Sequence, residues 1–192
     1  MHRAADAVFE AARPTATEAM GEVVLTHLNS YGPATRRDIA WWAGVGLTPV
    51  DQALKALGEQ VVRLLGPGGR TYLDVAEPPR GGTTDPGLRL LPEFDGLFLG
   101  YEGPGRTRFV DSAGLTRLWA KVNGLFAPSV LDDGRVVASW KTITKGRRHD
   151  IEVTMLPGCA RITVDRFAAP VAAVEAALGI AITDVRVRHG IS

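Results

Sequence analysis

A stretch rich in proline and glycine divides the 192-residue chain into two parts. Residues 77–87 contain three Pro and three Gly, and no apolar side chain other than proline. This composition disfavours both helix and strand and is typical of linkers and long exposed connections. The sequence therefore predicts two small domains, residues 1–77 and 88–192, joined by a linker over residues 78–87.

The overall composition excludes several classes of protein. Apolar residues make up 45% of the chain, which argues against wholesale disorder. No apolar run approaches the roughly 18 residues of a membrane span, and the first residues do not lead into a signal-peptide core. The single cysteine, Cys159, excludes an internal disulfide and indicates a reducing compartment. We therefore expect a soluble cytoplasmic protein without a membrane partner, and the scattered histidines predict neither a metal site nor a cofactor.

The first part of the chain carries three amphipathic helical patterns followed by a hairpin pattern. The helical patterns cover residues 17–29, 35–43 and 48–57. The expected N-caps are Thr17, Thr35 and Thr48, with Pro49 at the first position of the third helix. Two strands, at about residues 61–65 and 70–75, flank a Gly-Pro-Gly-Gly turn. This order predicts a winged helix-turn-helix, whose hairpin is the wing.

The charges on these helices give only a weak indication of DNA binding. The third helix presents one cation, Lys55, beside Asp51 and Glu59, whereas DNA-docking helices usually present several cations to phosphate. The candidate DNA contacts in this part of the chain are Arg36, Arg37, Gln52 and Lys55. The alternative is that these residues form an ordinary solvated surface.

Two aromatic residues of the first part are singled out by their positions. Trp41 lies opposite Ile39 on its helix, and an outward tryptophan is either a stacking platform or part of an interface with another domain or copy. His27 falls on an apolar stripe and is expected to be a hydrogen-bonded core histidine.

The second part of the chain predicts short strands around one helix. Asp111 or Ser112 is the expected N-cap of a helix that carries Leu115, Leu118, Trp119 and Val122 on one face. An Asp133-Gly134 turn predicts a hairpin. The expected extended segments are residues 88–92, 96–101, 129–131, 135–143, 151–155, 162–164 and 183–188, and a further helix covers residues 170–178. The fold class is α+β, with the winged helix followed by a small antiparallel sheet or partial barrel.

The densest positive cluster lies in a predicted turn of the second part. The formal charge is −2 over residues 1–77 and +3 over residues 78–192. The cluster contains Lys145, Arg147, Arg148 and His149, with Lys141 nearby. Such a hairpin end is suited to contacting DNA phosphates, and the alternative is a solvated tip.

Several segments together resemble a known family. They are Tyr31–Thr35, Trp41–Gly44, Leu91–Asp95, Leu99-Gly100, Asn123-Gly124, Pro128, Asp133–Val137 and Trp140. Their order and spacing over about residues 20–170 resemble the AlkZ-like family of bacterial winged-helix DNA-binding proteins. This family includes glycosylases that remove bulky alkylated purines and unhook interstrand crosslinks. The resemblance implies tandem winged helices that form a concave, positively lined surface for duplex DNA.

The resemblance does not supply catalytic residues. The family's Gln-x-Gln or Gln-x-Asp motif belongs to an N-terminal winged helix, and family members are about twice as long as this chain. Gln52 and Gln60 are followed at the second position by Leu54 and Val62, so neither matches the motif. We therefore expect either a fragment or a naturally short member of the family.

Three functions are consistent with the sequence. The first is a duplex DNA-binding protein that makes phosphate contacts and lacks its own catalysis. The second is a DNA glycosylase acting on alkylated or crosslinked bases, in which Glu93 and Asp95, about 7 Å apart on one face of a strand, would form an acid/base pair. Both carboxylates could instead cap a turn or pair with an arginine. The third is a protein-interaction or self-association module that uses the Trp41 face.

Overall fold

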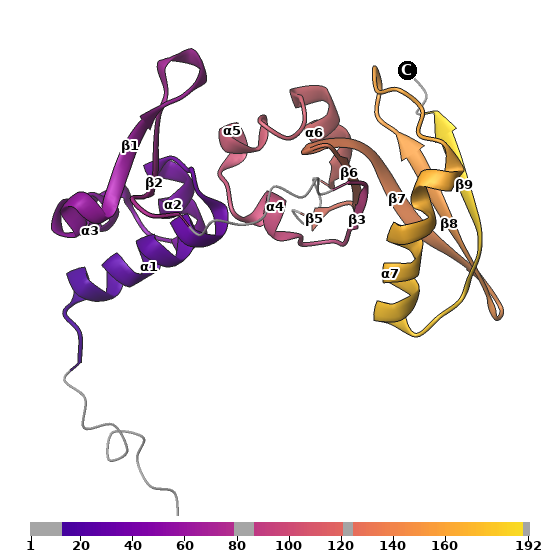
Figure 1. Ribbon diagram of the computed structural model, residues 1–192, viewed down its shortest axis with the longest axis horizontal. Helices are drawn as coiled ribbons and strands as arrows, with labels where there is room; N and C mark the ends of the chain where they lie inside the picture. The colour runs from indigo at the N-terminus through magenta and orange to yellow at the C-terminus, as the bar shows by residue number, and fades with distance from the viewer. Residues whose placement is uncertain (1–12, 79–86, 121–124, 190–192) are drawn as a thin grey trace, which may run out of the picture. The chain divides into compact units, whose positions relative to one another are not determined.

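The chain forms two compact units of mixed α and β structure. The structure is a computed structural model that describes residues 13–78, 87–120 and 125–189 (Figure 1). The units are Met1–Arg80 and Gly81–Ser192, and most of the predicted linker lies outside the described residues. No helix in the described ranges is long and apolar enough to cross a membrane.

The first unit consists of three helices and a two-stranded antiparallel hairpin. Its elements are α1 (Ala16–Tyr31), α2 (Arg36–Ala43), α3 (Leu47–Leu57), a 3-10 turn (Gly58–Gln60), β1 (Val61–Leu65), a second 3-10 turn (Pro67–Gly69) and β2 (Thr71–Val75). Its core contains buried side chains from all three helices and from β2, among them Val24, Ile39, Val50 and Leu73. His27 is fully buried, as expected, and the centroid of its ring lies 5.3 Å from the centroid of the Trp42 ring.

Two of these helices begin at a capping box. The Thr35 hydroxyl accepts from the Asp38 N–H at 3.2 Å, while the Asp38 carboxylate accepts from the Thr35 N–H at 2.8 Å. The same arrangement starts α1 at Thr15, whose partner is Glu18. The prediction of Thr17 as N-cap is therefore wrong, because the box formed by Thr15 and Glu18 starts the helix two residues earlier and leaves Thr17 inside it.

The third helix starts differently from the prediction. Its N-cap is Gly46, without a side-chain hydrogen bond, so Thr48 is inside the helix and Pro49 is the third residue. A proline is tolerated there because the first four N–H groups of a helix have no partner within the helix.

Removing the cap of α2 tests how strongly this local signal stabilises the unit. We expect Thr35→Ala to lower the free energy of unfolding by about 1 kcal/mol, because the Asp38 N–H loses its acceptor and the Asp38 carboxylate loses the hydroxyl donor, while the Thr35 N–H remains. Urea unfolding followed by circular dichroism measures the change. Thr35→Ser keeps the hydroxyl and serves as the control, and equal losses in both variants would contradict the capping explanation.

The second unit contains a five-stranded sheet, a two-stranded pair and four short helices within the described residues. Its elements are β3 (Arg89–Leu91), α4 (Gly96–Leu99), α5 (Gly103–Arg106), α6 (Ser112–Leu118), β4 (Trp119–Ala120), β5 (Leu125–Phe126), β6 (Ser129–Asp132), β7 (Arg135–Lys145), β8 (Arg148–Met155), a 3-10 turn (Val164–Phe167), α7 (Ala168–Leu178) and β9 (Ile182–His189). The large sheet has the strand order β3-β6-β7-β8-β9, and β4 pairs with β5. Asp133 and Gly134 both have positive φ in the tight turn between β6 and β7, as an Asp-Gly hairpin requires.

The large sheet is mixed, which corrects the expectation of an antiparallel sheet. β9 runs parallel to β8, and the chain reaches it through the 3-10 turn and α7, which lies across one face of the sheet (Figure 1). Parallel neighbours require such a crossover, because a tight hairpin can only return the chain antiparallel. The predicted strand at residues 162–164 is also wrong, since Val164 lies in the 3-10 turn and is 46% exposed.

Two further elements differ from the sequence-based expectation. Residues 96–99 form the short helix α4 rather than an extended segment, because the Asp95 side chain accepts from the Leu97 N–H and caps a helical turn. The helix α6 has Asp111 as its N-cap, as one of the two alternatives predicted, but it ends at Leu118. Trp119 therefore belongs to β4, and Val122 lies outside the described residues.

Apolar and charged residues alternate along β7, β8 and β9, so this part of the large sheet has one apolar face and one charged face. The apolar face packs against Phe167 and Val174 in the core. Its buried residues are Ala138, Ile151, Val153, Met155 and Val187. Successive side chains of a strand point to opposite sides, so the intervening residues of β7, β8 and β9 lie on the other face. We call this second face the outer face; its charged residues are Lys141, Lys145, Arg148, Asp150, Glu152, Asp184, Arg186 and Arg188.

Candidate nucleic-acid interface

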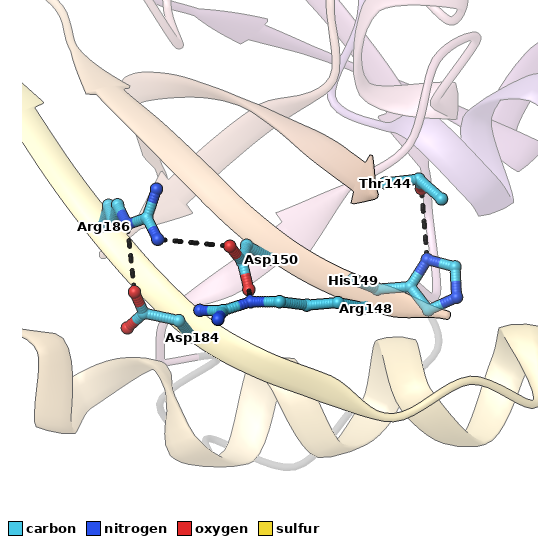
Figure 2. Close-up of polar contacts among 6 residues, drawn as sticks. All are labelled: Thr144, Arg148, His149, Asp150, Asp184 and Arg186. Atoms are coloured by element: carbon cyan, nitrogen blue, oxygen red, sulfur yellow. Dashed lines mark hydrogen bonds and ion pairs between the residues drawn. The ribbon is translucent and has the colours of Figure 1, made fainter. Parts of the chain in front are cut away.

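The basic cluster predicted from the sequence forms the tip of the long β7–β8 hairpin. Lys145 is paired with Arg148, and the turn consists of Gly146 and Arg147, with Gly146 at a φ of 60°. Lys145, Arg147 and Arg148 are exposed. His149 lies on the core side of the strand, where its Nδ1 is 3.1 Å from the Thr144 hydroxyl (Figure 2).

Behind the tip, the carboxylate of Asp150 holds two arginines in place. Figure 2 shows Asp150 between Arg148 of its own strand and Arg186 of β9. Its two oxygens accept from Arg148 Nε at 2.9 Å and from Arg186 Nη2 at 3.2 Å, and Arg186 Nε also donates to Asp184 at 2.9 Å. The Asp150 side chain is only 7% exposed, so the two guanidinium groups largely cover it.

One step further along the strand, Glu152 forms a second centre of the same kind. Its two oxygens are each 2.9 Å from a cationic nitrogen, Lys141 Nζ on β7 and Arg188 Nη2 on β9. The hydrogen bond from Lys141, together with the positive charge of Arg188 and Arg186, lowers the pKa of Glu152 below its usual range. The partnership with Asp150 likewise raises the pKa of Arg148.

The cations that pair with Asp150 and Glu152 remain exposed to solvent. The outer face carries five cations against three carboxylates, and two of those carboxylates lie beneath the cations. The four paired cations keep side-chain exposures between 46% and 62%. An arginine has five N–H donors in a rigid fork, so a guanidinium that contacts one carboxylate can still donate to a phosphate. The outer face thus carries an array of oriented cations whose remaining donors are suited to contact phosphate.

The lowered pKa of Glu152 predicts how this array responds to acid. A carboxylate whose pKa is lower in the folded state contributes stability above its ordinary pKa and loses it as the pH falls through the lowered value. We expect Glu152→Gln to be less stable than the parent chain at neutral pH, and this difference to vanish in strong acid. Urea midpoints measured across the acidic range test this.

The matched control for this pH series is Glu59→Gln. Glu59 is exposed and makes no ion pair among the described residues. A stability difference for Glu152→Gln that stays constant with pH would contradict the assigned ion pairs.

The candidate DNA contacts of the first unit lie on α2 and α3. Arg36 Nη1 is 2.6 Å from Asp51 Oδ2, so this cation links α2 to α3 and is partly neutralised. Arg37, Gln52 and Lys55 are exposed. The charge available on this surface is therefore smaller than that of the hairpin tip and the outer face.

The predicted acid/base pair does not have the expected strand geometry. Glu93 and Asp95 follow β3 in a turn, where Phe94 between them has a φ of 59°. Asp95 caps α4, which is the structural alternative considered from the sequence, and Glu93 is exposed. In the described part of the chain, no group of three His, Cys, Asp or Glu side chains is arranged to hold a metal ion.

Sequence reasoning did not identify four residues of this candidate interface. The outward orientation of Arg186 and Arg188 follows from their alternation with Val185 and Val187, but their position beside the hairpin depends on the parallel pairing of β8 and β9. The supporting roles of Asp150 and Glu152 depend on the same pairing. The only local signal is their placement two residues apart directly after the basic turn.

Comparison with known proteins identifies the family to which this chain belongs. The family model for AlkZ-like DNA glycosylases matches residues 1–186. The interstrand DNA cross-link repair glycosylase of Streptomyces sahachiroi is 28% identical over 180 residues, which cover 91% of this chain and 47% of the relative. The solved structure of the S. sahachiroi DNA glycosylase AlkZ has a TM-score of 0.74 at 26% identity, covering 92% of this chain and 47% of that one. The chain thus spans about half the length of these relatives, and it belongs to the AlkZ-like DNA glycosylase family.

Proposed function

We propose that this chain binds duplex DNA and acts in the excision of alkylated or crosslinked bases. The observation that carries the proposal is the match to the AlkZ-like DNA glycosylase family over residues 1–186. The hairpin tip and the outer face supply the chemistry that duplex binding needs, because cations oriented by carboxylates can neutralise phosphates along the backbone. The proposal implies that the chain acts where the chromosome is, which agrees with the cytoplasmic location expected from the sequence.

A glycosylase role is better supported than DNA binding without catalysis. The matched family and the S. sahachiroi relative are both described as glycosylases. Excision requires a group beside the sugar that orients water or stabilises the developing charge. Asp95 is engaged in capping α4, so we do not assign it this role, and Glu93 is kept as the candidate to be tested.

We further propose that the first unit is a winged helix whose α3 faces the duplex. The order of three helices followed by the β1–β2 hairpin supports this proposal. Gln52 and Lys55 are exposed on α3 and would contact a base edge and a phosphate.

Two assays on one protein preparation test the proposed function. Duplex affinity measured over a salt series should fall steeply, with a slope of about −0.9 for each phosphate contact in a log–log plot. Release of the modified base from alkylated duplex should be detected and should be weaker in Glu93→Gln if that residue takes part. A flat salt response would overturn the binding proposal, and binding without base release would restrict the chain to the DNA-holding role.

Self-association through the Trp41 face is a second candidate. Trp41 is 43% exposed on α2, and the same unit exposes Val62, Leu64 and Leu65 on β1. If two copies pack through this surface, light scattering should give a dimer mass for the parent chain and a monomer mass for Trp41→Ala. A monomer mass for the parent chain at all concentrations would exclude this candidate.

A further inference from the structure

We propose that the cavity beside Trp119 in the second unit binds a single unpaired nucleobase. The cavity has a volume of about 390 Å³, and its lining residues are Gly103, Pro104, Arg106, Thr107, Ser112, Leu115, Thr116 and Trp119. This volume lies within the range of roughly 300–1,000 Å³ that small-molecule sites occupy. This inference rests on the proposed function only for the source of the base, which is DNA. The site is inferred from its own geometry.

A stack of three aromatic rings ends at the cavity. Phe98 and Phe126 are both buried and lie parallel, with ring centroids 4.6 Å apart and an interplanar angle of 4°. Trp119 continues the stack at 5.5 Å from Phe126 and 30°. Trp119 is 44% exposed, although a stacked indole would usually be covered in a core. The stack therefore presents its last ring to a ligand, and a flat aromatic base is the group that would extend it.

Arg106 adds a positive charge to the same wall. It is 3% exposed, and its Nε donates to the Phe98 carbonyl at 2.8 Å. Its guanidinium carbon lies 4.8 Å from the Phe126 centroid and 5.7 Å from that of Trp119, so it is held against both rings. A cation at this position favours a ligand with electron-rich ring nitrogens and carbonyl oxygens on its edge.

Hydroxyl groups on the remaining walls complement the edge of a base. The Thr107 hydroxyl donates to the Pro104 carbonyl at 2.8 Å, and the Thr116 hydroxyl donates to the Ser112 carbonyl at 2.9 Å. With their hydrogens engaged, both oxygens retain lone pairs that can accept from an exocyclic amino group. The cavity thus combines a stacking face, a cation and hydroxyl acceptors, which is the set of contacts that an unstacked base uses.

The local sequence explains why the stack is fixed in place. Asp95 caps α4, and α4 carries Phe98 into the core. Trp119 and Phe126 face each other across the β4–β5 pair. The segment around Asp95 therefore supports the aromatic stack, which gives it a structural role that does not require Asp95 itself to react.

The test compares three duplexes of one sequence in binding assays with the full chain. One duplex is fully paired, one contains a single extra adenosine, and one contains an abasic residue in place of that adenosine. We expect the parent chain to prefer the adenosine bulge to the abasic bulge by about tenfold, the lower part of the range for stacking of one base on an aromatic ring. Trp119→Ala should abolish this preference and leave the affinity for the paired duplex unchanged.

Two other variants keep the test decisive. Thr116→Phe fills the cavity from an exposed helix position while the ring stack stays intact, so it should also abolish the preference even if Trp119→Ala fails to fold. Phe94→Ala removes an exposed aromatic side chain that does not line the cavity and should retain the preference. A preference that survives both cavity variants would show that the base binds elsewhere and would overturn the proposal.

A titration with adenosine separates this site from the proposed function. The indole N–H signal of Trp119, assigned by its absence in Trp119→Phe, should shift on addition of adenosine and not on addition of inorganic phosphate. A shift without any duplex binding would contradict the proposed function and support the site. Duplex binding without a shift and without a bulge preference would contradict the site alone, and a shift with phosphate only would identify an anion site instead.

Discussion

Replacing Lys145 and Arg147 together by alanine is expected to weaken duplex binding by about ten- to a hundredfold near 0.1 M salt, and to reduce the log–log salt slope by about 2. Both residues are exposed at the tip of the β7–β8 hairpin, and neither makes an ion pair within the described ranges. Their charge is therefore available to phosphate without first breaking an internal contact. Arg148 is left in place because its removal would take one cation from the buried Asp150 carboxylate.

The control for this variant changes the same net charge elsewhere in the second unit. Arg117 on α6 and Arg161 after β8 are exposed and lie outside the hairpin and the outer face. The double variant Arg117→Ala/Arg161→Ala should change the affinity and the salt slope much less. If both double variants behave alike, DNA responds to the overall charge of the chain and the hairpin is not the contact.

The second large effect is a loss of stability when the core under the sheet is opened. Phe167 is fully buried in the 3-10 turn that precedes α7, and it packs in one cluster with Ile151, Val153 and Val174. Phe167→Ala removes most of this ring and leaves a cavity between α7 and the sheet, which we expect to cost about 3–5 kcal/mol. Urea unfolding followed by tryptophan fluorescence and circular dichroism measures the loss.

Val164 provides the matched control in the same turn. Because its side chain is 46% exposed, Val164→Ala should change the free energy of unfolding by no more than about 0.5 kcal/mol. Comparable losses in the two variants would mean that the turn itself, rather than the buried ring, holds α7 against the sheet. The outer face should also lose DNA affinity in Phe167→Ala, since β9 is reached through this turn and α7.

Signals confined to a few neighbouring residues predicted the local structure well. Thr35 with Asp38 completes a capping box, and Asp133-Gly134 forms the tight turn between β6 and β7. Each of these features is decided by hydrogen bonds or backbone angles within four residues, so the sequence contains all the information needed. Thr48 shows the limit of such local signals. Threonine favours the N-cap position, yet α3 starts earlier, with Gly46 as its N-cap and Thr48 inside the helix.

The segment after β8 shows that an apolar alternation does not identify a strand by itself. Ile162 and Val164 have the spacing of a strand, yet only Ile162 is buried, and Val164 starts the turn that leads to α7. Short apolar patterns are ambiguous between strand and other structure until their packing partners are known. The parallel placement of β9 depends on that crossover, and no local residue specifies it.

The sequence by itself determined where the cations of this protein lie along the chain and which of them alternate with apolar residues. Turn composition is enough to place Lys145 and Arg147 in a turn, and the alternation of Arg186 and Arg188 with Val185 and Val187 is enough to put both arginines on one side of a strand, because turn chemistry and a period of two are local properties. Only the tertiary structure decided that β9 lies beside β8, so that Asp150 and Glu152 hold cations from both neighbouring strands. The physical reason is that strand order and register are fixed by the burial of a common core across residues far apart in the chain, which no short window contains.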